Sequence, residues 1–144
     1  WVNGQRAEFL DNFSLTFRKI LCFAVPISFL IFIFRNQIIA LIFKTGQFGQ
    51  GSVELTAVCL GLFALGIWAN SLIPLVLRAF FSLQDTKTPT VIAVFAMVLN
   101  VVLCLGFVRL FNSIIGLPLA FSVDSILQFI LLMAFLRRKL AKSF

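Results

Sequence analysis

The stretch that decides the fold is "PTVIAVFAMVLNVVLCLGFV", residues 89–108, which carries no charged side chain. About 20 such residues, wound as an α-helix, cross the hydrocarbon core of a membrane. Similar apolar stretches predict three further spans, at residues 20–43, 55–77 and 114–136. Lipid offers no hydrogen-bond partner to the backbone, and the alternation typical of a barrel is absent, so all four are expected to be helices. The predicted fold class is all-α, a polytopic membrane helix bundle.

Composition supports this prediction. The chain has 144 residues, of which 61% are hydrophobic and 12% charged, and its mean hydropathy is +1.09. Soluble domains have about 45–50% apolar and about 25% charged residues. The net charge of +7 would suit nucleic-acid binding in a soluble protein, but here the basic residues lie between apolar runs and at the ends. We therefore expect a single membrane domain over residues 1–144, with membrane lipids and no nucleic acid as its partners.

The first 19 residues have a different pattern. Apolar side chains interrupt polar ones at Phe9, Phe13 and Phe17, which predicts an amphipathic interfacial helix leading into the first span. The chain starts at Trp1 rather than Met, and the first apolar run lacks the small-residue cleavage site of a signal peptide. We expect the chain to be a piece of a longer protein or the product of a gene fragment.

Basic residues predict the orientation. Four spans put both termini and the connection near Lys87 on one side of the membrane. That side holds nine basic residues and the other side three: Arg6, Arg18, Lys19, Arg78, Lys87, Arg137, Arg138, Lys139 and Lys142 against Arg35, Lys44 and Arg109. Because cytoplasmic loops are enriched in Lys and Arg, both termini are predicted to be cytoplasmic. The terminal "RRKLAK", residues 137–142, is interpreted as a topology anchor.

Catalytic and metal-binding patterns are missing from the sequence. The three cysteines, Cys22, Cys59 and Cys104, stand apart in apolar runs, and the chain has no histidine. "GQFGQG", residues 46–51, lacks the Lys-Ser/Thr of a phosphate-binding loop and is predicted to be a non-cytoplasmic turn. We expect neither an enzyme nor a metal site, and no cofactor.

The fourth span carries a polar stripe. Gly116, Ala120, Asp124 and Gln128 recur every four residues and so share one helix face. A charged residue in mid-span costs about 2.5–3.5 kcal/mol on insertion scales, and such residues often mark ion or substrate paths. Asp124 is interpreted either as a proton or cation site, or partner of a basic group, or as a buried carboxyl that is hydrogen-bonded to a neighbour or protonated.

The second and third spans carry polar groups too. Asn100 shares a face with Ala96 and Cys104 and is expected to hydrogen-bond to another helix. In the second span the stripe consists of Gly66, Asn70, Pro74 and Arg78. Pro74 and, in the first span, Pro26 are expected to kink their helices, a feature found in transporters but also common in other membrane helices.

Four motifs resemble the MurJ/MviN lipid II flippase family, in order and with similar spacing over nearly the whole chain. "LRAFFSLQDTKTP", residues 77–89, is similar to the family's Arg-Ala-Phe-Tyr-Ala-x-x-Asp-Thr-x-Thr-Pro loop, and its Asp-Thr-Lys-Thr-Pro part is the most specific match. The others are "LIFKTGQF" (41–48), "VLNVVL" (98–103) and "GLPLAFS" (116–122). Asp124 departs from the family, where a small or apolar residue is usual.

The resemblance implies the ninth to twelfth of about fourteen helices in a bacterial inner-membrane protein, within its C-terminal lobe. It implies export of undecaprenyl-linked peptidoglycan precursor by alternating access against an N-terminal lobe, which would be the partner of this chain. Two alternatives stay open at this point. One is a lobe of a related drug/cation antiporter or polysaccharide exporter, and the other is a self-contained four-helix membrane protein.

The polar connection between the second and third spans has two interpretations. As a plain turn, it places Arg78 at a helix C-terminus, lets Thr88 cap the next helix and lets Asp85 pair with Lys87. As part of a cytoplasmic gate, it presents Arg78 to a lipid diphosphate. The candidate substrate or gate residues are Arg78, Asp85, Lys87, Asn100, Asp124 and Gln128.

Overall fold

The computed structural model describes residues 2–43 and 49–142 and contains four long helices in them. These are α1 (Val2–Phe43), α2 (Gln50–Ser82), α3 (Lys87–Phe111) and α4 (Gly116–Lys142). Each is long and apolar enough to cross a membrane, and the described residues form no strand. The all-α prediction is confirmed. Half of the predicted turn at residues 46–51 lies outside the described part, which resumes at Gly49, and Gln50 and Gly51 already belong to α2.

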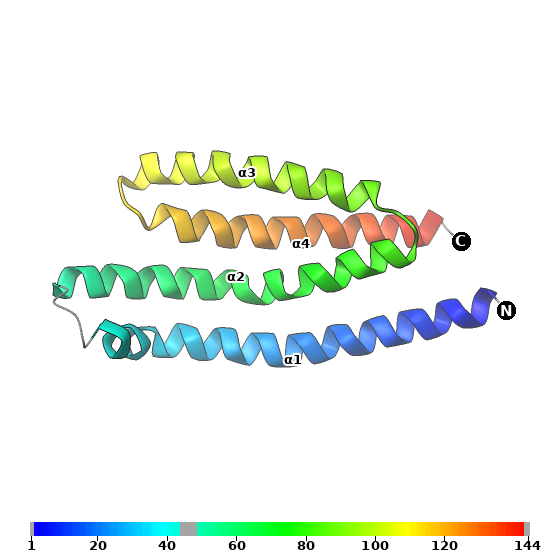
Figure 1. Ribbon diagram of the computed structural model, residues 1–144, viewed down its shortest axis with the longest axis horizontal. Helices are drawn as coiled ribbons and strands as arrows, with labels where there is room; N and C mark the ends of the chain where they lie inside the picture. Colours follow the sequence, from blue (N-terminus) through cyan, green and yellow to red (C-terminus); the bar gives the residue numbers. More distant parts are fainter. Residues whose placement is uncertain (1, 44–48, 143–144) are drawn as a thin grey trace.

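The helices lie side by side in the order α1, α2, α4, α3 (Figure 1). Both termini and the α2–α3 connection lie at one end, here called the terminal end, and the α1–α2 and α3–α4 connections lie at the other, the distal end. The contacts between elements follow this order, since α2 packs on α1 and α4, α4 also packs on α3, and α2 scarcely touches α3. The layer has α1 and α3 at its edges, so much of their surface is uncovered.

The expected interfacial segment is helical, but it does not form a separate element. Residues 2–19 continue without a break into the first span as part of α1. No glycine or proline stands between Gln5 and Val25, so nothing in the sequence interrupts the helix there. Pro26 and Pro74 both lie inside continuous helices, and α2 bends near its middle (Figure 1). A proline that removes a backbone hydrogen bond accounts for such a bend.

Small residues and hydroxyl groups hold the layer together where helices cross. Ser28 on α1 donates a hydrogen bond to the Ala64 carbonyl on α2, and Ser122 on α4 donates to the Leu62 carbonyl. A Cβ added to Gly66 would lie 3.0 Å from the Ser122 Cα, so the backbones of α2 and α4 are close there. This is the usual chemistry of helix contacts in membranes, where small residues allow close approach.

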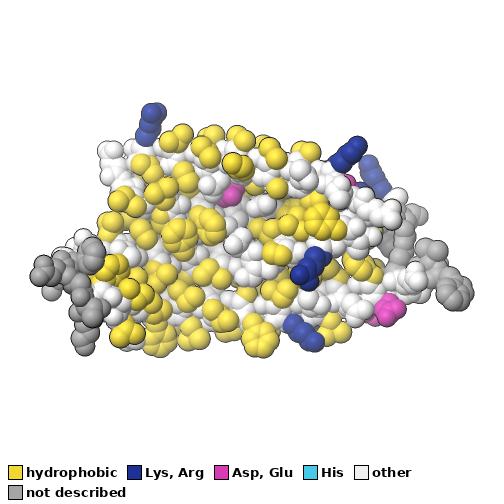
Figure 2. Space-filling model, in the orientation of Figure 1, with side chains coloured by type: hydrophobic (Ala, Val, Ile, Leu, Met, Phe, Trp, Pro, Cys, Tyr) yellow, Lys and Arg dark blue, Asp and Glu magenta, His cyan; other side chains and the backbone are white. Residues whose placement is uncertain are grey.

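One hydrophobic cluster fills the terminal end, where α2, α3 and α4 meet. Its largest fully buried side chains are Phe80, Val76 and Leu132, and Ile92 joins it from α3. On the face shown in Figure 2, hydrophobic side chains are spread over the middle of the layer, whereas most Lys and Arg side chains in view lie toward the terminal end. This surface distribution is that of a protein surrounded by lipid.

Candidate functional site

The α2–α3 connection is a tight turn that the backbone fixes. Gln84 has a positive φ of 57°, its N–H donates to the Phe81 carbonyl, and the Asp85 N–H donates to the Phe80 carbonyl. These two bonds form a Schellman motif, which satisfies carbonyls at the end of α2. The turn brings the Asp85 side chain to the start of α3.

Asp85 organises this end of the molecule. Its Oδ1 accepts a hydrogen bond of 3.2 Å from the Thr88 N–H, and its Oδ2 accepts one of 2.6 Å from the Thr88 hydroxyl. Oδ2 also forms an ion pair with Lys139 near the end of α4. The single carboxylate therefore joins the start of α3 to α4. Hydrogen bonds from Lys139 and then from Thr88 hold the pKa of Asp85 well below its usual range.

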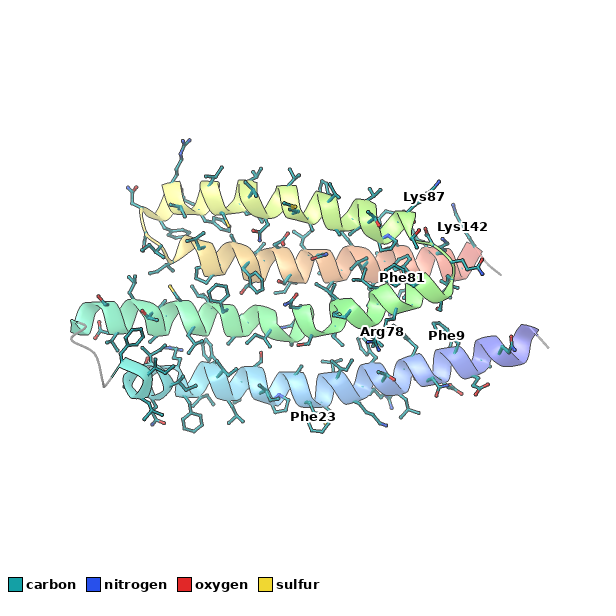
Figure 3. The ribbon with its side chains drawn as sticks, viewed as in Figure 1. Phe9, Phe23, Arg78, Phe81, Lys87 and Lys142 are labelled. Atoms are coloured by element: carbon teal, nitrogen blue, oxygen red, sulfur yellow. The ribbon has the colours of Figure 1, made fainter. Side chains whose placement is uncertain are left out.

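Two details of the sequence interpretation are wrong here. Thr88 was expected to cap α3, but it lies within the first turn and the capping acceptor is Asp85. Asp85 was expected to pair with Lys87, but its cationic partner is Lys139. The reason is geometric, because the acceptor must precede the first turn of α3 to reach its free N–H groups. Lys87 is exposed at the terminal end (Figure 3).

The stripe predicted on α2 divides into an inner and an outer part. Gly66 is buried against α4, whereas Asn70, Pro74 and Arg78 are exposed, together with Ser71. Figure 3 shows Arg78 on the half of α2 nearer the terminal end. An uncovered polar face on a membrane helix is costly in lipid. This face of α2, which we call the polar face (Asn70, Ser71 and Arg78), therefore requires contact with water or with protein.

Asn100 and Asp124 meet between α3 and α4. The Asn100 Nδ2 donates to the Asp124 Oδ2 at 3.3 Å, and the Cys104 thiol lies 3.6 Å from the Asn100 Oδ1. Asp124 is 9% exposed, and its Oδ1 is buried without a hydrogen-bond partner. The interhelical hydrogen bond expected of Asn100 is present. The Asp124 Oδ1 is therefore a strong acceptor that remains free to take a proton or a hydrogen bond from another donor.

The structure brings together only part of the predicted set. Asn100 joins Asp124, while Gln128, one turn further along α4, is half-buried with no partner in the described part of the chain. Arg78, Asp85 and Lys87 lie near the terminal end instead. The described residues contain no group of three or more His, Cys, Asp or Glu side chains placed to hold a metal ion.

The structure draws attention to two side chains that the sequence analysis did not single out. Lys139 lies in the terminal basic run, residues 137–142, and contributed only to the count of basic residues that predicts the orientation. Its ion-pair partner, Asp85, lies 54 residues earlier, too far for a local sequence pattern to reveal. Arg35 interrupts the apolar sequence of α1, and its Nε is buried without a partner. That interruption was a signal, because an arginine inside a span rarely stands without a function.

Comparison with known proteins now identifies the family. The sequence model described as "Lipid II flippase MurJ" matches residues 1–144. The chain belongs to the MurJ family. A probable lipid II flippase MurJ from Buchnera aphidicola subsp. Baizongia pistaciae is 29% identical over 142 residues, which are 99% of this chain and 26% of the relative. The lipid II flippase MurJ of Burkholderia cenocepacia is 29% identical over 138 residues, or 96% of this chain and 27% of the relative.

A shorter match extends the same result. The probable lipid II flippase MurJ of Rhizobium meliloti is 31% identical over 103 residues, which are 72% of this chain and 19% of that protein. The chain thus spans about a quarter of the length of the first two MurJ relatives. The resemblance stated from the sequence motifs is confirmed at the level of the family.

Proposed function

We propose that this chain is part of the C-terminal lobe of a flippase that moves undecaprenyl-linked peptidoglycan precursor across the bacterial inner membrane. Membership of the MurJ family and four apolar helices support this proposal. In it the protein is a transporter and not an enzyme, and the termini lie in the cytoplasm with the basic side of the layer. Transport proceeds by alternating access between this layer and an N-terminal lobe.

The observation that carries the proposal is the polar face of α2. Asn70, Ser71 and Arg78 are exposed on a helix that crosses the membrane, while neighbouring side chains of the same helix are fully buried. A self-contained four-helix protein would have to present this face to lipid, which is costly. A lobe of a larger transporter presents it instead to the other lobe or to a water-filled route.

Arg78 is the residue on this face that we propose contacts the substrate. It lies nearer the cytoplasmic end in the proposed orientation, and its guanidinium is exposed. A planar guanidinium binds phosphate oxygens in pairs, which suits a lipid diphosphate. The α2–α3 turn follows Arg78 along the chain, and Asp85 in that turn joins the start of α3 to Lys139 on α4. In this proposal the turn and Arg78 form the cytoplasmic gate, and the ion pair makes the gate move together with the lobe.

We propose a separate role for Asp124. Its free Oδ1 lies between α3 and α4, and its described partner, Asn100, is neutral. A carboxylate that is buried with only neutral partners needs a proton or a cation. Binding or release of that ion between α3 and α4 would couple the motion of the lobe to an ion gradient.

Rescue of a strain depleted of its lipid II flippase tests the proposal. The natural protein containing this chain should restore growth, and Arg78→Ala should abolish most of the export while membrane abundance stays unchanged. Arg78→Lys should restore part of it, because charge remains but paired contacts are lost. Arg109→Ala, an exposed arginine at the distal end of α3, is the matched control and should export normally. Unchanged export by Arg78→Ala at normal abundance would show that Arg78 does not contact the substrate. Failure of the unaltered protein to rescue growth would overturn the proposed substrate.

A further inference from the structure

The seam between α1 and α2 contains an apolar groove of about 270 Å³. It is open along the edge of the layer, and its walls come from both helices: Val25, Ser28, Phe29, Phe32, Ala64, Leu65 and Trp68. The Ser28 hydroxyl is already used by its hydrogen bond to the Ala64 carbonyl, so this wall offers no free hydroxyl donor. The groove is suited to a hydrocarbon chain.

Arg35 lies at the distal end of this groove. It is one helical turn beyond Phe32, its guanidinium carbon lies 4.8 Å from the centre of the Phe32 ring, and its Nη1 donates to the Phe32 carbonyl at 3.4 Å. From Val25 to Arg35 is about 15 Å along the helix. The groove therefore runs from an apolar middle to a cationic end, and this arrangement is complementary to an amphiphile with an apolar chain and an anionic headgroup.

The local structure holds the Arg35 side chain against α2. A Cβ on Gly61 would lie 2.9 Å from the Arg35 Cδ, so the Arg35 side chain occupies the space that a larger residue at position 61 would need. The Nε is buried and has no hydrogen-bond partner, and no acidic side chain pairs with Arg35 in the described residues. The Phe32 carbonyl and ring leave most of the five N–H donors of this guanidinium without an acceptor in the described residues, and a phosphate anion would supply acceptors for them.

We infer that this groove binds an anionic glycerophospholipid of the surrounding bilayer, with one acyl chain along the seam and its phosphate at Arg35. Charge complementarity selects the phosphate, because Arg35 lies eight residues, about 12 Å along the helix, before the distal end of α1, and a long arginine side chain can extend from there toward lipid headgroups. On α2 the groove is lined by Ala64, Leu65 and Trp68, and the polar face begins two residues later, at Asn70. The two sites therefore occupy successive stretches of α2, with the lipid site on the distal side of the face proposed for transport.

Native mass spectrometry of the purified natural protein tests this inference. Phosphatidylglycerol and phosphatidylcholine with identical acyl chains are titrated in parallel. We expect the unaltered protein to prefer phosphatidylglycerol by about tenfold, because its headgroup has a net negative charge at Arg35, whereas the choline cation of phosphatidylcholine offsets the same phosphate. Arg35→Gln should reduce the preference to about twofold or less, whereas Arg109→Gln, which removes an exposed arginine from the same end, should leave it unchanged.

Two further variants separate the site from general loss of folding. Gly61→Ala keeps the charge but displaces the Arg35 side chain, and it should lower the preference while leaving the protein folded. Leu65→Trp fills the groove from its exposed rim and should weaken both lipids equally. A wild-type preference in Arg35→Gln, or an equal loss in Arg109→Gln, would overturn the inference. So would displacement of phosphatidylglycerol by equimolar polyprenyl phosphate, or absence of any bound phospholipid, which would show that substrate or protein occupies the groove.

Discussion

Helices α2 and α3 are both apolar enough to span a membrane, yet they place their polar groups on opposite sides. In α3, Asn100 turns inward to Asp124, and the exposed surface is apolar, as at Met97, Val98 and Val102. In α2 the buried surface is apolar and Asn70, Ser71 and Arg78 are exposed. Lipid can cover α3 as it stands, but it cannot cover α2 without cost. Hydropathy alone does not reveal this difference, because it measures how apolar a stretch is and not the side of the helix on which its polar groups lie.

The largest expected effect concerns the contact that covers the inner side of α3. A Cβ at Gly116 would lie 2.7 Å from the Phe107 backbone, so Gly116→Ala must push α3 away from α4. We expect a loss of about 1–3 kcal/mol in the free energy of unfolding, measured by denaturant titration in micelles. Gly106→Ala is the control, because no atom lies within 4 Å of its Cβ position, and it should not destabilise the protein. Equal stabilities of the two variants would contradict the close packing of α3 on α4.

The second prediction concerns the polar pair inside that contact. Asn100→Leu leaves the Asp124 carboxyl without its hydrogen-bond donor, and we expect it to cost about 1–2 kcal/mol of stability. The double variant Asn100→Leu/Asp124→Leu should recover most of this loss, since no buried acceptor remains. The single variant Asp124→Leu completes the comparison in the same unfolding assay. If the stability losses of the two single variants simply add in the double variant, the two side chains do not interact.

The smallest expected effect is the pH dependence at the terminal end. Because the folded state lowers the pKa of Asp85, the carboxylate adds stability above its unfolded pKa of about 4 and loses it as the pH falls below that value. The unfolding temperature should therefore fall more steeply below pH 4 in the unaltered protein than in Asp85→Asn. Lys139→Met should show the same flattening, because Lys139 is the main cause of the shift. Identical acid profiles for all three would mean that the ion pair contributes nothing.

The sequence predicted the helices better than their arrangement. Apolar length predicted four spans, and the four-residue spacing of Asp124 correctly predicted an inward face of α4. Neighbour relations between helices depend on contacts far apart in sequence, so the pairing of Asp85 with Lys139 was beyond a local pattern. The continuity of α1 was missed for a different reason, since an amphipathic and an apolar stretch can share one helix when no breaker separates them.

The sequence also could not show which residues of the candidate site are covered by a neighbouring helix. Asn70 and Arg78 were predicted to share a stripe with Gly66, and only the structure shows which part of that stripe is covered. A helical pattern gives the angle between residues but not the direction in which the neighbouring helix lies. Arg35 was counted only for its charge, although its place within the apolar sequence distinguished it.

Spin labels at two matched positions test the central claim, that the polar face of α2 does not face lipid. Ser71 is 11 residues before Ser82, the end of α2, and Val98 is 11 residues after Lys87, the start of α3, so both lie at a similar depth from the terminal end and both are exposed. Each is replaced by a labelled cysteine in the natural protein, reconstituted in bilayers after removal of its native cysteines. The account predicts high collision rates with dissolved oxygen at Val98 and low rates at Ser71. Equally high oxygen accessibility at Ser71 would show that lipid covers the polar face and would contradict the claim.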